Sequence, residues 1–275
     1  MSMTGTTSNL IDTTFQKLKE EGRTAFIPFL TVGDPDPETT VDLIAGIERA
    51  GADILELGVP YSDPLADGPV IQRASERALQ HGITINSCLE AARKARERGV
   101  QMPFVLFTYY NPVLQMGLES FMSAASESGI SGLIIPDLPF EESGEVLELA
   151  DRAGLHLIPL VAPTSEGRIQ AILGKARGFV YCVSSLGVTG VRASFHEGIE
   201  DFIGSVKQAT DLPVALGFGI SSHEQVVRFS ALCDGIVIGS AIVREIESKA
   251  ELLGREETKE DALLQICSFV SQLKG

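Results

Sequence analysis

The sequence predicts a (β/α)8 barrel preceded by one extra helix. Eight short apolar runs recur along the 275 residues, and an amphipathic segment follows each of them. The runs are rich in Val, Ile, Leu and Phe and do not alternate polar with apolar residues, which is typical of strands buried on both faces. Eight strand–helix units in one chain of this length favour a closed barrel. The runs span residues 25–32, 52–59, 103–110, 132–138, 156–162, 178–184, 213–220 and 235–238.

The segments between the runs have the spacing of helices. In residues 38–50, the apolar side chains of Val41, Ile44 and Ile47 fall on one stripe, as expected for a helix that packs against a sheet. Residues 9–21, which precede the first run, are spaced in the same way. We expect this extra helix to cap the bottom of the barrel.

A doubly wound open sheet is the main rival to the barrel. Such a sheet normally carries a glycine-rich dinucleotide turn after its first strand, and residues 31–35 do not form one. No linker, low-complexity stretch or run of charge divides the chain. We therefore expect residues 1–275 to form a single domain.

The composition limits the classes of partner. The chain carries 22 Lys and Arg against 37 Asp and Glu residues, a net charge of −15 at pH 7. This balance argues against binding to nucleic acid or to an anionic membrane, although backbone amides can still hold a small anion. The four cysteines lack metal-type spacing, and the four histidines form no metal or triad pattern. With no signal peptide and no apolar stretch of ~18 residues, we expect a soluble cytoplasmic protein.

A carboxylate interrupts the second apolar run. Glu56 lies within residues 52–59, where burial of an acid without a partner is costly. Asp63 and Asp67 follow on a loop that is rich in proline and glycine. One carboxyl on a strand and others on an adjoining loop suit acid–base chemistry on a bound molecule. A Glu satisfied by an Arg or a backbone amide is the structural alternative, but with the loop included we favour catalysis.

Three glycine-bearing turns follow the last three predicted strands. They comprise residues 187–190, 217–220 and 239–240, at the ends of the strands where barrel enzymes place their active sites. Glycine lets backbone amides approach a ligand closely, and a helix that starts near residue 240 presents its N-terminus to an anion. One such turn indicates only a bend, whereas three in succession predict a phosphate site.

Other residues at strand ends have two readings each. By its position Asp137 could be catalytic, or it could cap the helix expected near Glu141 or organise a surface between subunits. We favour a structural or interface role over a catalytic one. The buried hydroxyl of Tyr181 needs a partner, and Glu56 is a candidate across the barrel mouth. Tyr109 lines the pocket or its rim. Residues 186–194 form a lid that closes over a ligand, or an ordinary surface connection.

Several motifs together resemble the tryptophan synthase alpha subunit family. The most specific is Glu56-Leu-Gly-Val-Pro-Tyr-Ser-Asp-Pro-Leu-Ala-Asp67-Gly-Pro. Motifs at residues 28–35, 109–112, 136–139, 187–190 and 217–220 also resemble that family and occur in its order. The resemblance covers nearly the whole chain, about residues 15–273. One departure is Ser184-Ser185-Leu186 ahead of the lid glycine, where some members carry an Arg.

The resemblance implies an enzyme that cleaves indole-3-glycerol phosphate to indole and glyceraldehyde-3-phosphate by a retro-aldol reaction. It also implies a beta subunit with pyridoxal phosphate, which receives the indole in an α2β2 heterotetramer, and no cofactor or metal in this chain. The implied catalytic residues are Glu56, Asp67 and Tyr181. The implied substrate-binding residues are Phe29, Tyr109, Ile134, Thr189, Gly190, Phe218, Gly219, Gly239 and Ser240. The residues implied to face the partner are Asp63, Pro64, Asn111 and Pro139.

The residues agree with this chemistry. An indolyl carbanion is a poor leaving group, so C3 of indole is protonated before the carbon–carbon bond breaks. Glu56 is placed to donate the proton to C3 and to remove the proton of the glycerol hydroxyl next to the ring, and we expect burial to raise its pKa. Asp67 is placed to stabilise the charge that develops on the indole nitrogen. A free-standing indole-3-glycerol-phosphate lyase is the alternative. An indole-glycerol-phosphate synthase would require a strand lysine, which no run contains, and an inactive regulatory partner would not require both carboxylates.

Overall fold

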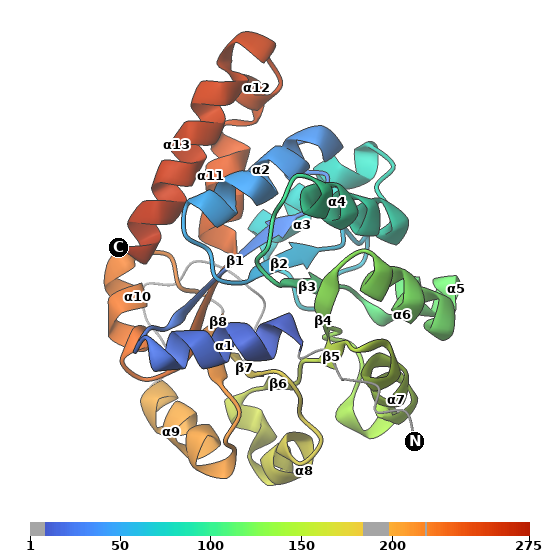
Figure 1. Cartoon of the computed structure of the whole chain (residues 1–275), viewed down its shortest axis with the longest axis vertical. Coiled ribbons are helices and arrows are strands. Elements are labelled where there is room, and N and C mark those ends of the chain that lie inside the picture. Colours follow the sequence, from blue (N-terminus) through green and yellow to red (C-terminus); the bar gives the residue numbers. More distant parts are fainter. Residues whose placement is uncertain (1–8, 184–197, 218) are drawn as a thin grey trace.

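The computed structural model describes residues 9–183, 198–217 and 219–275 and contains one parallel sheet that curls into a barrel (Figure 1). Neighbouring strands follow the order β5-β4-β3-β2-β1-β9-β8-β7-β6. The strands are β1 (Ala25–Thr31), β2 (Leu55–Gly58), β3 (Phe104–Phe107), β4 (Ile130–Ile134), β5 (His156–Leu157), β6 (Leu160–Val161), β7 (Val180–Val183), β8 (Val214–Gly217) and β9 (Gly235–Ile238). Each lies within a predicted run except β4, which begins two residues before the run at 132–138.

The sheet closes across an interrupted strand. β5 and β6 are two pieces of the predicted strand at residues 156–162, separated by Ile158 and Pro159. The Ile158 amide donates to the Leu133 carbonyl of β4 at 2.9 Å, and the Pro159 carbonyl accepts from the Tyr181 amide of β7 at 3.0 Å. Pro159 has no N–H to donate, which explains why the ladder breaks there. The predicted eight-stranded barrel is therefore confirmed, and the open sheet is excluded.

Helices surround the barrel (Figure 1). The helices are α1 (Leu10–Glu20), α2 (Pro37–Arg49), α3 (Pro69–Gln80), α4 (Ile85–Glu97), α5 (Tyr110–Met116), α6 (Leu118–Glu127), α7 (Gly144–Ala153), α8 (Ile169–Leu173), α9 (Ile199–Ala209), α10 (His223–Ser230), α11 (Ser240–Ser248), α12 (Ala250–Leu253) and α13 (Glu256–Lys274), with 3-10 turns η1 (Phe140–Glu142) and η2 (Pro163–Arg168). Helix α2 shows how they start: Asp36 accepts from the Thr39 amide at 2.8 Å, and Pro37 occupies the first turn.

Alternation along the strands divides the core into two layers. On β1, Phe26 and Leu30 pack into the outer cluster, between the sheet and the helices, whereas Ile27 and Phe29 belong to the cluster inside the barrel. On β2, the neighbours of Glu56 belong to the outer cluster. Because successive side chains of a strand point to opposite faces, Glu56 points into the barrel.

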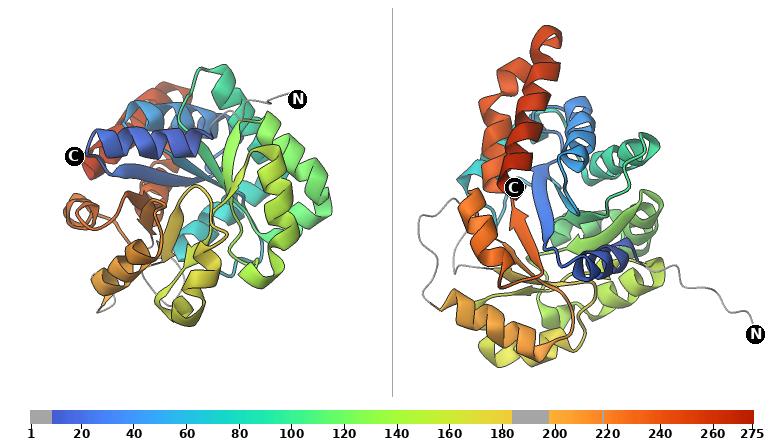
Figure 2. Two further views of the ribbon diagram at one scale, coloured as in Figure 1. Left: turned by 60° about the horizontal axis from the view of Figure 1, so that its bottom comes forward. Right: turned by 60° about the vertical axis from the view of Figure 1, so that its left-hand side comes forward.

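The extra N-terminal helix closes one end of the barrel. Ile11, Phe15 and Leu18 of α1 are buried among the residues of the barrel interior. The rings of Phe15 and Phe179 lie 5.4 Å apart, and Phe15 also approaches Gly235, the first residue of β9. Helix α1 therefore lies at the N-terminal ends of the strands (Figure 2), as the sequence predicts, and leaves the C-terminal ends for the site.

Candidate active site

A small cavity opens at the C-terminal ends of the strands. Its volume is about 30 Å³. It is lined by Phe29, Glu56, Asp67, Ile71, Phe107, Tyr181, Gly219, Ile220, Val237, Gly239 and Ser240. The sequence predicts seven of these as site residues, namely Phe29, Glu56, Asp67, Tyr181, Gly219, Gly239 and Ser240. The structure brings these seven together from strands on both sides of the barrel.

Glu56 is a buried carboxyl with an open hydrogen-bonding position. Its side chain is 1 % exposed, and Oε1 has no hydrogen-bond partner within the described part of the chain. Burial raises the pKa of Glu56 to about 8, because removal from water disfavours the charged form. At neutral pH this group holds a proton that it can donate to a molecule in the cavity.

The raised pKa of Glu56 predicts a dependence of stability on pH. The folded state holds this proton more tightly than the unfolded state. Its contribution to the free energy of unfolding is therefore complete below about pH 4.5 and declines as the pH rises to about 8. We expect Glu56→Gln to be more stable than the wild type by about 2–4 kcal/mol at pH 8, and by much less at pH 5. Urea unfolding at both pH values measures this difference. Glu119→Gln, on the exposed surface of α6, is the matched control, and equal shifts in both variants contradict the assignment.

Asp67 is held by a tyrosine. The Tyr109 hydroxyl donates to Asp67 Oδ2 at 3.0 Å and accepts from the Ala66 amide at 3.0 Å, and the ring of Tyr61 stacks on Tyr109 with centroids 4.7 Å apart. Burial raises the pKa of Asp67 to about 6, and the hydrogen bond from Tyr109 opposes that rise. Near pH 7, Asp67 is therefore mostly ionised while Glu56 is mostly protonated, so the two carboxyls can take opposite roles.

Gly58 and Gly217 leave room for the aromatic side chains of the site. A Cβ on Gly217 would overlap the hydroxyl of Tyr181, and a Cβ on Gly58 would overlap the ring of Phe29. The pKa of Tyr181 is raised well above its usual value, first by burial and then by the nearby charge of Glu56. Tyr181 thus remains a hydrogen-bond donor beside Glu56, as the sequence suggests. The need for glycine at 58 and 217 is visible only in three dimensions.

The far side of the cavity is made of backbone. Gly219 has a φ of 88°, a conformation that favours glycine. Gly239 and Ser240 begin α11, and no side chain among the described residues caps its N-terminus. Backbone N–H groups at such an end bind anions well. Thr189, Gly190 and Phe218, which the sequence also predicts here, lie outside the described residues, as do the proposed lid at 186–194 and residues 184–186.

An ion-pair network connects the two helices that begin at the cavity. Arg77 of α3 makes two hydrogen bonds to the buried Asp34, at 2.8 and 2.9 Å, and a third to Glu247 of α11 at 2.8 Å. Glu247 also accepts two hydrogen bonds from Arg73, both at 2.8 Å. Because α3 follows Asp67 and α11 follows Gly239, the network fixes the two walls of the cavity relative to each other.

The remaining predicted residues that the structure describes do not line this cavity. Ile134 is buried in the inner cluster, and Tyr109 acts through Asp67. Asp137 accepts from the Tyr110 amide at 2.9 Å and so caps α5; the structural reading is right, although the helix differs from the one expected near Glu141. The predicted rim residues are Asp63, Asn111 and Pro139, which are exposed, and Pro64, which is half-buried. Ile71, Phe107 and Val237 line the cavity without having been predicted, and Ile220 lines it within the predicted turn at 217–220.

The fold and the cavity define a class of protein. A closed (β/α)8 barrel with two carboxyls of different raised pKa at its C-terminal mouth is a barrel enzyme of the acid–base type. Within the described ranges, no three side chains of His, Cys, Asp or Glu are grouped so that they could hold a metal ion.

Comparison with known proteins identifies the family. Residues 15–272 match the family model described as "Tryptophan synthase alpha chain". A tryptophan synthase alpha chain of Geobacillus kaustophilus is 54% identical over 248 residues, which cover 90% of this chain and 92% of that protein. Another, of Bacillus pumilus, is 55% identical over 250 residues, which cover 91% and 94%. The chain belongs to the tryptophan synthase alpha chain family.

Solved structures agree. The tryptophan synthase subunit alpha of Legionella pneumophila str. Paris has a TM-score of 0.87 at 37% identity, and the match covers 96% of this chain and 97% of that one. A chain from the structure of Mycobacterium tuberculosis tryptophan synthase has a TM-score of 0.84 at 33% identity, with 96% and 99% covered.

Proposed function

We propose that Glu56 and Asp67 divide the acid–base work of the family's reaction. As a member of the tryptophan synthase alpha chain family, the chain is a lyase that cleaves indole-3-glycerol phosphate to indole and glyceraldehyde-3-phosphate, and a beta subunit uses the indole. The observation that carries the assignment is the open Oε1 of Glu56, buried in the same cavity as Asp67. A buried proton donor beside an ionised carboxylate is the pair that the reaction needs.

The reaction proceeds in two proton transfers at Glu56. The protonated carboxyl first donates to C3 of the indole ring, and the ring nitrogen becomes positively charged. Asp67 accepts the hydrogen bond of that N–H and stabilises the charge. Glu56, now a carboxylate, takes the proton of the glycerol hydroxyl next to the ring. The oxygen forms the new carbonyl, the carbon–carbon bond breaks, and its electrons return to the ring, so Glu56 ends protonated again.

Tyr181 and the aromatic walls support these steps. The Tyr181 hydroxyl keeps its proton because burial and the charge of Glu56 raise its pKa. In our proposal it donates a hydrogen bond to the carboxylate form of Glu56 or to the glycerol oxygen. Phe29 and Phe107, whose rings meet edge to face at 6.0 Å, provide apolar contact for the indole ring, with Ile134 and Tyr109 behind them.

The backbone wall holds the phosphate. We assign to the phosphate the amides of Gly219 and of Gly239 and Ser240 at the N-terminus of α11, which all line the cavity. We assign Thr189, Gly190 and Phe218 to the same end of the substrate. Binding there would fix the glycerol chain so that its hydroxyl faces Glu56.

A substitution at Gly219 tests this wall. We expect Gly219→Val to weaken binding of glycerol 3-phosphate at least about tenfold, since a side chain replaces the close approach of the backbone. Binding of indole should change much less. Calorimetry with both ligands measures the two effects. Gly22→Val is the control, because Gly22 also has a positive φ of 64° but lies in open space far from the site; equal losses for both ligands place the phosphate elsewhere.

We assign the rim of the barrel mouth to the partner. Asp63, Pro64, Asn111 and Pro139 lie on this rim, and two large apolar side chains nearby, Leu65 and Leu114, are 76% and 50% exposed. These exposed apolar groups would become buried if a partner docked on the rim. The proposed assembly is an α2β2 heterotetramer in which pyridoxal phosphate belongs to the beta subunit and this chain carries no cofactor.

The remaining proposals concern the chain as a whole. We propose that residues 1–275 act as one domain, because a single family model matches residues 15–272. None of the helices in the described ranges is long and apolar enough to cross a membrane. We propose the cytoplasm as its location, in keeping with four free cysteines, three of them buried.

Turnover with and without the beta subunit tests the proposed assembly. We expect the isolated chain to release indole slowly and the beta subunit to raise its turnover at least about tenfold, because the partner binds the closed, carboxylate-aligned state more tightly. Asp63→Ala should weaken this activation without changing the basal rate. The measurement is single-turnover indole release at increasing beta subunit. An isolated chain as fast as the complex, with Asp63→Ala silent, supports the free-standing lyase instead.

A further inference from the structure

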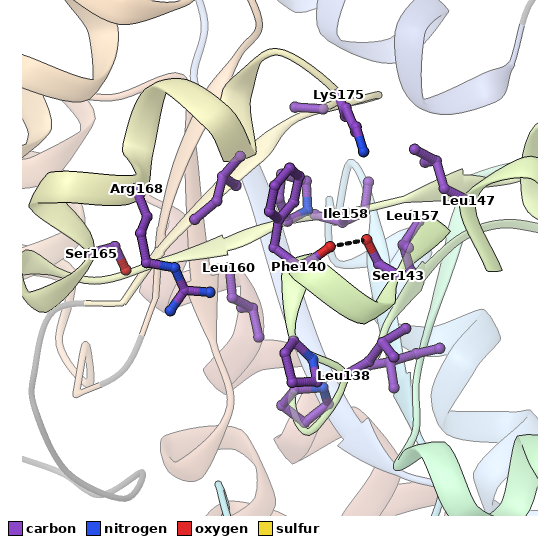
Figure 3. A pocket seen from close by; sticks show the side chains of 16 residues that line it. Leu138, Phe140, Ser143, Leu147, Leu157, Ile158, Leu160, Ser165, Arg168 and Lys175 are labelled. Atoms are coloured by element: carbon purple, nitrogen blue, oxygen red, sulfur yellow. Dashed lines mark hydrogen bonds between the residues drawn. The ribbon is translucent and has the colours of Figure 1, made fainter. Parts of the chain in front are cut away.

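A second cavity, of about 210 Å³, lies between α7 and α8 against the interrupted strand (Figure 3). It shares no lining residue with the carboxylate cavity. Its origin is the break at Ile158 and Pro159, which divides the strand, together with the shortness of α8, which has five residues. A short helix leaves part of the sheet uncovered, and the space that remains is the cavity.

The walls of this cavity combine apolar side chains with polar and cationic ones. Leu138, Leu147, Leu157 and Leu160 supply apolar surface, and the ring of Phe140 stands among them (Figure 3). The cations Arg168 and Lys175 also line the cavity, and no Asp or Glu is among the lining residues that the structure describes. In a chain with a net charge of −15, a cavity whose described lining residues include cations and no acid favours an anion.

The two cations differ in their partners. Arg168 pairs with Glu141 at 2.6 Å, so its charge is largely compensated. Lys175 has no ion pair within the described part of the chain; its ammonium lies 5.2 Å from the centre of the Phe140 ring. Figure 3 shows this side chain directed toward Phe140 and Ser143. Lys175 is therefore the charge that is available to a ligand.

We propose that this cavity binds a small amphipathic carboxylate, separately from the lyase reaction. The apolar part, preferably one aromatic ring, packs on Phe140 and the leucines, and the carboxylate pairs with Lys175. The size agrees, because a cavity of ~150 Å³ is known to accept benzene, so about 210 Å³ holds one ring with a short acidic arm. Ser143 donates to the Phe140 carbonyl at 2.8 Å, which fixes the turn that carries the ring.

The test uses 3-phenylpropionate and its neutral amide as probes. Binding to the full chain is measured by calorimetry with glycerol 3-phosphate present in excess to occupy the anion wall of the catalytic cavity. For a ligand of this size we expect a Kd of about 1 mM for the carboxylate and binding of the amide at least about fivefold weaker. Lys175→Met should weaken binding of the carboxylate about tenfold and leave binding of the amide unchanged. Lys19→Met, an exposed lysine on α1, should change neither.

A second variant tests the cavity itself. Leu147→Phe adds bulk from α7 and should weaken both probes, while a thermal melt checks that it remains folded. No saturable binding up to about 20 mM overturns the proposal. Equal affinity for the two probes, or no effect of Lys175→Met, overturns the preference for a carboxylate. Unchanged binding in both variants shows that the probes occupy another site, which also overturns it.

Discussion

Replacing Glu56 with glutamine should lower turnover at least about 10³-fold while leaving the fold and ligand binding intact. The amide has nearly the shape of the carboxyl, but it can neither donate the proton to C3 nor remove the proton from the glycerol hydroxyl. Both transfers in the proposed reaction pass through this group. The measurement is single-turnover indole release by the holo-complex, together with calorimetry of glycerol 3-phosphate, whose affinity should change less than about twofold.

The pH profile gives this prediction a second readout. Activity in the wild type requires Asp67 ionised and Glu56 protonated, so kcat/KM should rise near pH 6 and fall near pH 8. In Glu56→Gln the residual activity should lose the fall near pH 8, because the titrating group is gone. A variant that keeps a substantial share of wild-type turnover, or the same alkaline limb, removes Glu56 from the mechanism.

The strands and the inward direction of Glu56 could be predicted because they depend on local pattern. Apolar runs without alternation indicate strands covered on both faces, and a residue between two outward leucines must point inward. The same logic placed the helix at residues 9–21, whose buried stripe contacts the barrel interior. The glycine turns near 219 and 239 follow from their positions after late strands.

What could not be predicted depends on contacts between distant residues. Tyr109 lies 42 residues from Asp67, and only the closed barrel brings its hydroxyl to that carboxylate. Arg77 joins Asp34 and Glu247 across separations of 43 and 170 residues. The overlap that excludes a side chain at Gly58 involves Phe29 on the next strand. No periodicity in the sequence encodes such pairs.

These distant contacts explain why two buried carboxyls behave differently. Glu56 and Asp67 are both removed from water, and burial raises the pKa of each. Asp67 receives a hydrogen bond from the Tyr109 hydroxyl, which favours its charged form and limits the rise of its pKa. Strand β2 thus supplies the proton donor, Glu56, and the loop after it supplies the anion, Asp67. The hydrogen bond from Tyr109 helps to keep their pKa values apart.

Asp67 should therefore be the second most sensitive position in the site. We expect Asp67→Asn to lower turnover about 10²–10³-fold, because a neutral amide cannot stabilise the positive charge on the indole nitrogen. Tyr109→Phe should cost only about tenfold and should move the acidic limb of kcat/KM upward from about pH 6, since the lost hydrogen bond no longer favours the Asp67 carboxylate. Both variants are measured by single-turnover indole release across pH 5 to 9. Tyr110→Phe is the control, because Tyr110 is the next residue in the chain and is half-buried. If the acidic limb is unmoved in Tyr109→Phe, or if Asp67→Asn remains within about threefold of the wild type, then Asp67 only shapes the loop and another group must carry the charge.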